Sequence, residues 1–267
     1  MTDQHSRSVG QLKSQLKRRL RSVLPASFAS PPRMRDFAMP DAESRERKAT
    51  ATGELEKIFY SHTGRLIHKW TPFFEAYEKH LQDRRGTAVR MLEIGVSHGG
   101  SLEMWRTYLG NQATIFGIDI DPACATRVDA PNQVRIGSQD DPDFLKRVVA
   151  EMGGVDIILD DGSHFGRHQL KSFEVLFPLL SEGGTYLIED LQTSYWPSHE
   201  GGYRRRGTAV ELVKDMLDDL HGWYHTRDNG TPAKNEIASI HMYDSIVAIE
   251  KRAKSKPQHV QVGKPQP

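Results

Sequence analysis

The stretch VRMLEIGVSHGGSLEMW, residues 89–105, decides the fold class of this 267-residue chain. Its first half is apolar, a glycine-rich turn follows at 95–100, and its second half has the apolar spacing of a helix. A buried strand that enters a helix through such a turn is typical of an α/β sheet that binds its ligand at the carboxyl ends of the strands. We therefore expect the surrounding domain to alternate strands and helices.

The same alternation continues downstream to about residue 191. Short apolar runs at 114–120, 134–137, 155–159 and 185–188 predict four more strands, and periodic segments at 142–152 and 167–180 predict helices between them. Strands that are apolar throughout indicate a mostly parallel sheet covered on both faces. A further helix at 208–223 and an antiparallel hairpin, 237–242 with 245–250, complete a predicted doubly wound α/β fold.

The segments that flank this domain, which we place at residues 85–250, differ from it in composition. Residues 1–50 predict a basic arm and linker, partly disordered, with an amphipathic helix whose leucines recur between residues 12 and 24. That helix fits a solvated or self-associating arm, and docking on an anionic membrane or a partner is the alternative. Residues 51–84 predict a cap of two short helices, and 251–267 a disordered basic tail. The arm and cap are compatible with a homodimer.

Composition excludes several classes of protein. The chain has 36 Lys and Arg against 35 Asp and Glu, a formal net charge of +1, which argues against a general nucleic-acid binder. No apolar run approaches the ~20 residues of a transmembrane helix. The single cysteine, Cys124, excludes an internal disulfide and a cysteine-based zinc cluster. We expect a cytoplasmic globular protein.

Polar residues at the carboxyl ends of the first three predicted strands indicate a nucleoside site. Glu93 lies two residues before Gly95, and its negative charge disfavours the phosphate that a dinucleotide fold binds there. Asp119 follows Gly95 by 24 residues, near the ~20-residue offset of an acid that contacts ribose hydroxyls, although a helix cap is its alternative role. The candidate cofactor-binding residues are Glu93, Gly95, Ser97, Gly99, Ser101, Asp119, Ser138, Gln139, Asp140 and Asp160.

These residues resemble the motifs of class I S-adenosylmethionine-dependent methyltransferases. The family's first motif is an acid–x–glycine turn after strand one, matched by Glu93-Ile94-Gly95, and its second is an acid that ends strand two, matched by Asp119. Its last two strands form an antiparallel pair, which 237–250 can supply. The resemblance covers roughly residues 85–250 and implies a seven-stranded Rossmann-like sheet that binds S-adenosylmethionine.

The fourth and fifth predicted strands run into acidic residues. DDGSH, residues 160–164, follows one strand, and Glu189-Asp190 follows the next. Since neighbouring parallel strands lie ~4.8 Å apart, several carboxylates and an imidazole are expected in one small volume. A divalent cation relieves the repulsion between them, and carboxylate oxygens suit Mg²⁺ or Mn²⁺. We favour Asp161, Glu189 and Asp190 as ligands, with helix capping or pairing to arginines as the alternative.

This acidic motif resembles the metal-dependent sugar O-methyltransferases of the mycinamicin macrolide-sugar and methylmannose polysaccharide types. The matching patterns are DDGSH at 160–164 and IEDLQTSYW at 188–196. The resemblance implies that Asp161, Glu189 and Asp190 hold Mg²⁺ and that His164 is the general base. It implies methyl transfer from S-adenosylmethionine to a carbohydrate hydroxyl, on a mannose-type oligosaccharide or polysaccharide precursor or on a glycosylated natural product.

Four further residues are candidate substrate contacts. Tyr195 and Trp196 follow the acidic motif in a predicted loop, and Tyr60 and His62 lie in the predicted cap. Aromatic rings stack on sugar faces, and loops carry much of the binding chemistry of enzymes. The alternative for the loop is an ordinary surface segment with a packed Trp196.

Two other functions are compatible with the same residues. Asp161 with His164 and His168, one helical turn apart, would provide the two-histidine, one-carboxylate site of a nonheme iron hydroxylase, but Glu189 and Asp190 would then have no role. A non-catalytic nucleoside-binding module is the third hypothesis. It predicts that His164→Ala leaves the function intact.

Overall fold

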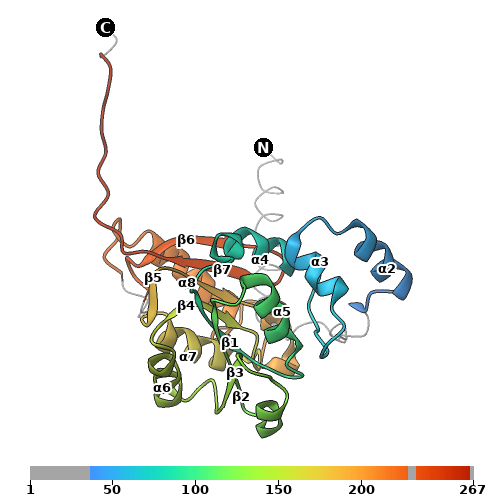
Figure 1. The fold of residues 1–267 in the computed structure, drawn as a ribbon. Coiled ribbons are helices and arrows are strands. Elements are labelled where there is room, and N and C mark those ends of the chain that lie inside the picture. Colours follow the sequence, from blue (N-terminus) through green and yellow to red (C-terminus); the bar gives the residue numbers. More distant parts are fainter. Residues whose placement is uncertain (1–36, 228–232, 265–267) are drawn as a thin grey trace, which may run out of the picture. The chain divides into compact units, whose positions relative to one another are not determined.

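The computed structural model describes residues 37–227 and 233–264 (Figure 1). The amphipathic helix predicted within residues 1–36 lies outside these ranges. Residues 39–267 form one compact unit. Its helices are α2 (Asp41–Thr50), α3 (Glu54–Ser61), α4 (Phe73–Leu81), α5 (Gly100–Leu109), α6 (Pro142–Met152), α7 (Gly166–Leu176) and α8 (Ala209–Leu220). Its strands are β1 (Arg90–Ile94), β2 (Thr114–Asp119), β3 (Gln133–Ile136), β4 (Val155–Asp160), β5 (Leu180–Ile188), β6 (Ile237–Met242) and β7 (Val247–Lys251).

The seven strands form one sheet in the order β3-β2-β1-β4-β5-β7-β6. The first five pair in parallel, and β7 pairs antiparallel with both β5 and β6, which confirms the predicted doubly wound sheet with its terminal hairpin. The strand order reverses between β1 and β4, where open α/β sheets bind their ligands. There Ile94 is level with Asp160, and Asp160 with Ile188, so β1, β4 and β5 end at one edge of the sheet.

Two buried cores cover the two faces of the sheet. Successive residues of a strand point to opposite faces, and in β1 Leu92 belongs to one core whereas Met91 belongs to the other. Helices α6, α7 and α8 pack on the face of Leu92, and α3, α4 and α5 pack on the face of Met91. Burial on both faces explains why the strands are apolar throughout in the sequence.

Helices α3 and α4 are the predicted cap, and they belong to the core. Leu55, Phe73 and Tyr77 are fully buried, and the Tyr77 ring meets the ring of Trp105 in α5 edge-on, with centroids 5.0 Å apart. The cap therefore fixes its own loop, 62–72, next to the start of α5.

The structure differs from the sequence prediction at α2, at the end of α7 and at the start of β5, which begins at Leu180 and not at residue 185. Helix α2 lies where we expected linker, and none of its residues is buried; it carries charged pairs such as Glu43 and Arg47, 3.7 Å apart. A search for apolar periodicity misses a helix of this kind. Helix α7 ends at Leu176, four residues early, because Pro178 follows and Lys251 donates hydrogen bonds to the carbonyls of Phe177 and Pro178.

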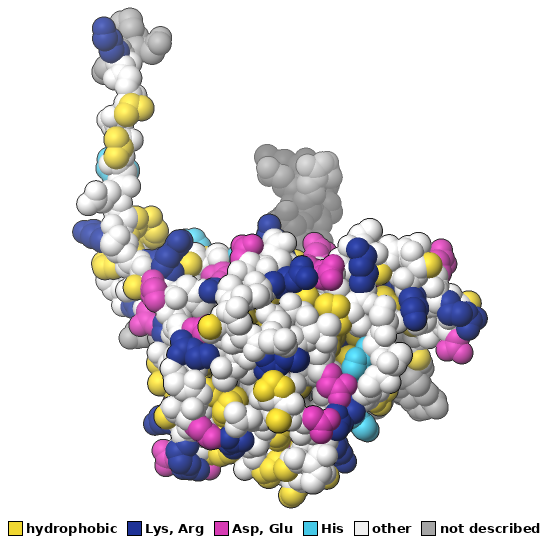
Figure 2. Space-filling model, in the orientation of Figure 1, with side chains coloured by type: hydrophobic (Ala, Val, Ile, Leu, Met, Phe, Trp, Pro, Cys, Tyr) yellow, Lys and Arg dark blue, Asp and Glu magenta, His cyan; other side chains and the backbone are white. Residues whose placement is uncertain are grey.

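Charged side chains of both signs are interspersed on the face drawn in Figure 2, in keeping with the formal net charge of +1. No described helix has the length and apolarity of a membrane span; the longest, α8, has 12 residues, against ~20 for a bilayer.

Candidate functional site

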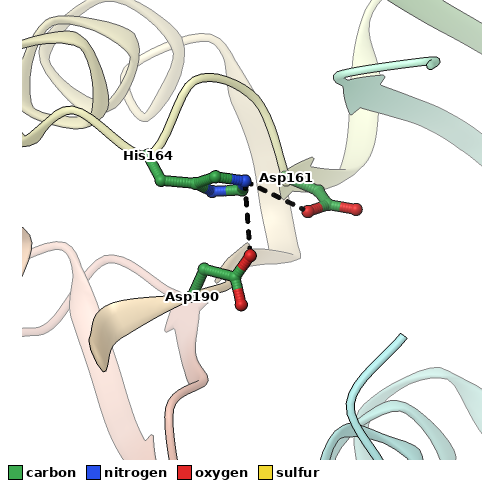
Figure 3. A group of neighbouring side chains, drawn as sticks. All are labelled: Asp161, His164 and Asp190. Atoms are coloured by element: carbon green, nitrogen blue, oxygen red, sulfur yellow. Dashed lines mark ion pairs between the residues drawn. The ribbon is translucent and has the colours of Figure 1, made fainter. Parts of the chain in front are cut away.

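Three predicted site residues meet at the carboxyl ends of β4 and β5: Asp161, His164 and Asp190 (Figure 3). One ligand atom from each lies within 4.8 Å of the other two. His164 Nε2 is 3.3 Å from Asp190 Oδ2 and 3.9 Å from Asp161 Oδ1. The side chains are 14 to 21% exposed, so water solvates these groups only partly. Two carboxylates and an imidazole form a donor set suited to a divalent cation.

The backbone at this group is held in an uncommon conformation. His164 and Asp190 both have a φ of 56°, in the left-handed region that non-glycine residues rarely occupy. Thr193 Oγ1 lies 3.2 Å from the His164 carbonyl and 2.6 Å from the Asp190 carbonyl, so it links the two loops. A left-handed backbone costs roughly 1–2 kcal/mol per residue, and here the two residues that adopt it turn their side chains toward each other.

Gly95 brings the turn after β1 against the Asp161 loop. Its φ is 95°, and a Cβ atom there would lie 2.1 Å from the carbonyl oxygen of Asp161. The Asp161 amide in turn donates to the carbonyl of Ile94. The absence of a side chain at Gly95 thus allows the Asp161 loop to approach the turn, and its role in cofactor binding stays a prediction. The predicted nucleoside turn and the acidic group are therefore adjacent.

Glu189, a predicted metal ligand, faces a different partner. Lys69 Nζ lies 2.9 and 3.0 Å from its two carboxylate oxygens, and the Tyr77 hydroxyl donates to the same carboxylate. Burial, together with the charge of Asp161, raises the pKa of Glu189 well above its usual value. In this structure Glu189 lies outside the group formed by Asp161, His164 and Asp190, and its role as a ligand stays a prediction.

Sequence reasoning missed Lys69 altogether. It also donates to Asp161, from which it is 92 residues distant along the chain, and it is 120 residues from Glu189. No spacing motif connects such positions. The available signal was a lysine between His68 and Trp70 in the predicted cap, in a chain with several acids at two strand ends.

Asp119 holds the glycine-rich turn. Its carboxylate accepts hydrogen bonds from the amides of Val96, Ser97 and Asp121, at 2.8 to 3.0 Å. Burial acts to raise the pKa of Asp119, but these backbone donors outweigh it and lower the pKa below its usual value. The next residue, Ile120, is 73% exposed at the strand end, an apolar surface that the sequence analysis did not single out.

Four other predicted cofactor residues are buried and bonded to protein. Ser101 Oγ donates to Glu93, 2.9 Å away, and Gln139 donates to Asp160 and accepts from the Ser163 amide. Burial raises the pKa of Glu93 to about 7 and that of Asp160 to about 6. These residues therefore form hydrogen bonds to one another and to the neighbouring loop inside the protein, at the strand ends. Among the predicted polar side chains, Ser97, Asp119, Ser138 and Asp140 remain nearer the surface.

His168 does not join Asp161 and His164. Its Nδ1 lies 2.7 Å from Ser163 Oγ, and its Nε2 lies 3.5 Å from Asp140 Oδ2. The candidate metal group in the described residues has Asp190 as its third member instead. The two-histidine iron site is therefore not formed, and that alternative is wrong.

The predicted substrate contacts fall into two places. Trp196 follows the 3₁₀ helix Leu191–Tyr195 and packs on His199, whose ring centroid is 6.4 Å from that of His164. Tyr195 is 48% exposed beside them. His199 was not anticipated; burial, followed by the neighbouring His164, lowers its pKa.

Tyr60 and His62 lie in the cap. Tyr60 packs on the rings of Phe59 and Phe74, and His62 Nε2 lies 2.8 Å from the carbonyl of Arg65 and 3.4 Å from Glu103 in α5. Their contacts are thus within the cap and with α5. A role in substrate binding stays a prediction for both.

Comparisons with known proteins agree with this geometry. Residues 92–191 match the family model of a methyltransferase domain. A tetracenomycin rhamnoside 3'-O-methyltransferase of Streptomyces olivaceus is 36% identical over 247 residues, 86% of this chain and 62% of the relative. The mycinamicin VI 2''-O-methyltransferase of Micromonospora griseorubida is 34% identical over 215 residues, 74% of this chain and 52% of the relative. The chain thus spans between half and two thirds of the length of these relatives.

A solved structure has the same fold. The MycE methyltransferase, crystallised with Mg, SAH and mycinamycin VI, superposes with a TM-score of 0.65 and 30% identity, over 81% of this chain and 63% of MycE. Together with the strand order, this similarity identifies the sheet as the Rossmann-like fold of methyltransferases.

Proposed function

We propose, from the premise that this chain carries a methyltransferase domain, that it transfers a methyl group from S-adenosylmethionine to a sugar hydroxyl of a glycosylated small molecule with the aid of Mg²⁺. The observation that carries the proposal is the group Asp161, His164 and Asp190, which lies beside the glycine turn of β1 at the ligand-binding edge of the sheet. Methyl donor and acceptor would meet between these two features.

The methyl donor fits the turn after β1 and the end of β2. Ser97 and Asp119 offer polar groups to the ribose there, and the exposed side chain of Ile120 offers an apolar surface to the adenine. The partly buried Asp161 on the same side contributes a carboxylate, which suits a sulfonium cation better than a phosphate.

The acidic group fits a divalent cation. Its carboxylates are partly buried and lie on either side of one imidazole nitrogen, a charge arrangement that a cation stabilises. Asp161 and Asp190 would hold Mg²⁺, with Mn²⁺ as a substitute, and Glu189 stays a candidate third ligand. A bound cation of this kind supplies the positive charge that lowers the pKa of a neighbouring hydroxyl.

His164 is the proposed general base. Histidine has a reference pKa near neutrality, which suits a group that must accept a proton and later release it. Its Nε2 is the ring nitrogen that faces both carboxylates, and it is the atom that would take up the proton.

The sugar that accepts the methyl group would lie against the segment that carries Tyr195 and Trp196. Tyr195 and Trp196 directly follow the strand end that carries Asp190, and Trp196 packs on His199 beside His164. The names of the relatives favour the sugar of a natural-product glycoside. A mannose oligosaccharide, a homodimer, a cytoplasmic location and the absence of a nucleic-acid partner stay predictions from the sequence.

Labelled methyl transfer tests the proposal directly. The protein is incubated with methyl-labelled S-adenosylmethionine, Mg²⁺ and a panel of glycosides that includes rhamnosylated aromatic compounds, deoxysugar macrolides and mannosides. We expect label to enter a sugar of one glycoside class and to be lost after chelation with EDTA and regained with Mg²⁺. Transfer that is unaffected by EDTA would refute the metal assignment, and label on an aglycone hydroxyl would refute the sugar assignment.

A further inference from the structure

Lys69 connects the cap to the acidic centre. It lies in the loop between α3 and α4, yet its ammonium group contacts acids at the ends of three strands: Glu93 at 3.7 Å, Glu189 at 2.9 Å, and Asp161 by a hydrogen bond. The Lys69 side chain is only 1% exposed. A buried lysine with three acidic neighbours is fixed by its charge pairs and by the packing around it.

The loop that carries Lys69 is itself fixed on α5. Arg65 forms an ion pair with Glu103 in α5 and a second one, 2.8 Å long, with Asp129. A Cβ atom at Gly100 would lie 2.2 Å from the carbonyl of Arg65, so the loop backbone lies directly on the start of the helix. Lys69 therefore has a defined position from which to orient its partners.

Asp161 divides its two oxygens between two neighbours. Oδ2 accepts from Lys69, whereas Oδ1 faces His164 Nε2 and belongs to the candidate metal group. A carboxylate that is held through one oxygen presents the other in a fixed direction. Partners that orient metal ligands in this way have large effects on metal affinity.

We propose that Lys69 is a positioning residue: through Oδ2 it orients Asp161 so that Oδ1 faces the divalent cation. The inference deepens the proposed function and rests on it. The proposal gives Lys69, a cap residue outside the 92–191 methyltransferase match, a role at the acidic strand ends.

Positioning and simple electrostatics predict opposite results for the loss of Lys69. If its charge only opposed a cation nearby, removing the charge would make the site more negative and would tighten metal binding. If Lys69 orients Asp161, its removal lets the carboxylate rotate away and weakens metal binding. The sign of the change in metal affinity therefore distinguishes the two roles.

The experiment measures Mn²⁺ binding to the full chain by the electron paramagnetic resonance of free Mn²⁺. We expect Lys69→Met to weaken binding by about 10- to 100-fold, Lys69→Gln, which keeps a hydrogen-bond donor, to weaken it less, and Lys69→Arg to be the mildest. Lys171→Met, at an exposed lysine on α7 paired with Glu174, is the matched control and should bind Mn²⁺ as the unaltered protein does.

Circular dichroism and S-adenosylhomocysteine titration identify variants that fail to fold. If Lys69→Met does not fold, the milder Lys69→Gln variant is measured in its place. Unchanged or tighter Mn²⁺ binding by folded Lys69 variants would overturn the positioning role while leaving the proposed metal site intact. No Mn²⁺ binding by the unaltered protein would overturn the metal site itself, and the positioning role with it.

Discussion

His164 and Asp190 illustrate how single residues are prepared for chemistry in this protein. Both have left-handed backbones, and Thr193 is placed to hydrogen-bond to both of their carbonyls. In these conformations the His164 imidazole and the Asp190 carboxylate face each other, with Nε2 and Oδ2 3.3 Å apart. The surrounding fold holds both backbones in place. Neither conformation is preferred by the residue itself.

Replacement of His164 tests the proposed base. We expect His164→Ala to lower the rate of methyl transfer by about 10²- to 10⁴-fold, the usual contribution of a general base, and to leave S-adenosylhomocysteine affinity unchanged. Single-turnover methyl transfer and calorimetric titration measure the two quantities. His168→Ala is the matched control, because His168 pairs with Ser163 and Asp140 instead; its rate should far exceed that of His164→Ala. Equal losses in both variants would contradict the assignment.

Gly95 has a left-handed backbone and a close backbone neighbour, and either would disfavour a side chain there. A comparison with Gly153, which has only the left-handed backbone, distinguishes the two effects. Gly153 has a φ of 75° with open space around it, so Gly153→Ala should cost only the left-handed strain, roughly 1–2 kcal/mol. Gly95→Ala adds a clash with the backbone of Asp161 and should lower the free energy of unfolding further. It should also weaken S-adenosylhomocysteine binding, which Gly153→Ala should not. Urea denaturation and ligand titration measure both effects; equal destabilisation would refute the clash.

At the scale of elements, the two ends of the parallel strands have different tasks. The carboxyl ends of β1, β4 and β5 carry the acids of the candidate site, whereas the amino ends of β1 and β4 are joined by an ion pair. There the Arg90 guanidinium donates to both oxygens of Asp156, and the Arg90 amide donates to Asp156 as well. The amino ends of β1 and β4 are thus joined by an ion pair, whereas at the carboxyl ends Asp161 and Asp190 both face His164.

The Arg90–Asp156 pair predicts a pH dependence of stability. Burial acts to raise the pKa of Asp156, but hydrogen bonds from Arg90 and Ser181 outweigh it and lower the pKa to about 2. A carboxyl whose pKa is lower in the folded state stabilises above its unfolded pKa of ~3.9 and loses that effect as the pH falls through about 2. We expect Asp156→Asn to cost about 2 kcal/mol at pH 7 and little near pH 2.

Urea denaturation at several pH values measures this difference. Glu151→Gln is the control, because Glu151 pairs with Arg135 at the surface with a half-exposed side chain, where solvent screens the pair. Its effect at pH 7 should be much smaller. A cost of Asp156→Asn that does not change between pH 7 and pH 2 would contradict the linkage.

At the scale of the whole molecule, the cap and the sheet share one core. Phe73 and Leu55 of the cap belong to the same buried cluster as Met91 of β1 and Trp105 of α5. The cap also supplies Lys69 to the acidic centre. Folding of the cap and formation of the site are therefore expected to be coupled.

A cavity in the cap tests that coupling. Phe73→Ala should lower the free energy of unfolding by about 3–5 kcal/mol, because a fully buried ring is removed. Far-ultraviolet and near-ultraviolet circular dichroism should report one coincident transition for the described unit, shifted to lower temperature. Leu66→Ala, at an exposed position in the same part of the chain, should leave the transition in place. Two separate transitions in Phe73→Ala would show that the cap unfolds alone.

Local chemistry let the sequence predict most of the sheet. Runs such as Val155–Leu159 mark strands because parallel strands are buried on both faces. The structure adds that the Asp141 side chain caps α6, which the sequence analysis did not predict. Asp161, His164 and Asp190 could be placed together because neighbouring parallel strands end at one edge. Helix α2 escaped prediction because it has no apolar face.

The sequence by itself determined the sheet, its glycine turn and the set of acids at two strand ends, since these depend on periodicities and on residues next to each other in the chain. Only the tertiary structure decided how the acids divide: Asp190 lies with Asp161 and His164, whereas Glu189 faces Lys69 and Tyr77. The reason is physical. A side chain's direction depends on what packs around it, and Lys69 reaches Glu189 across 120 residues of chain that no local pattern spans.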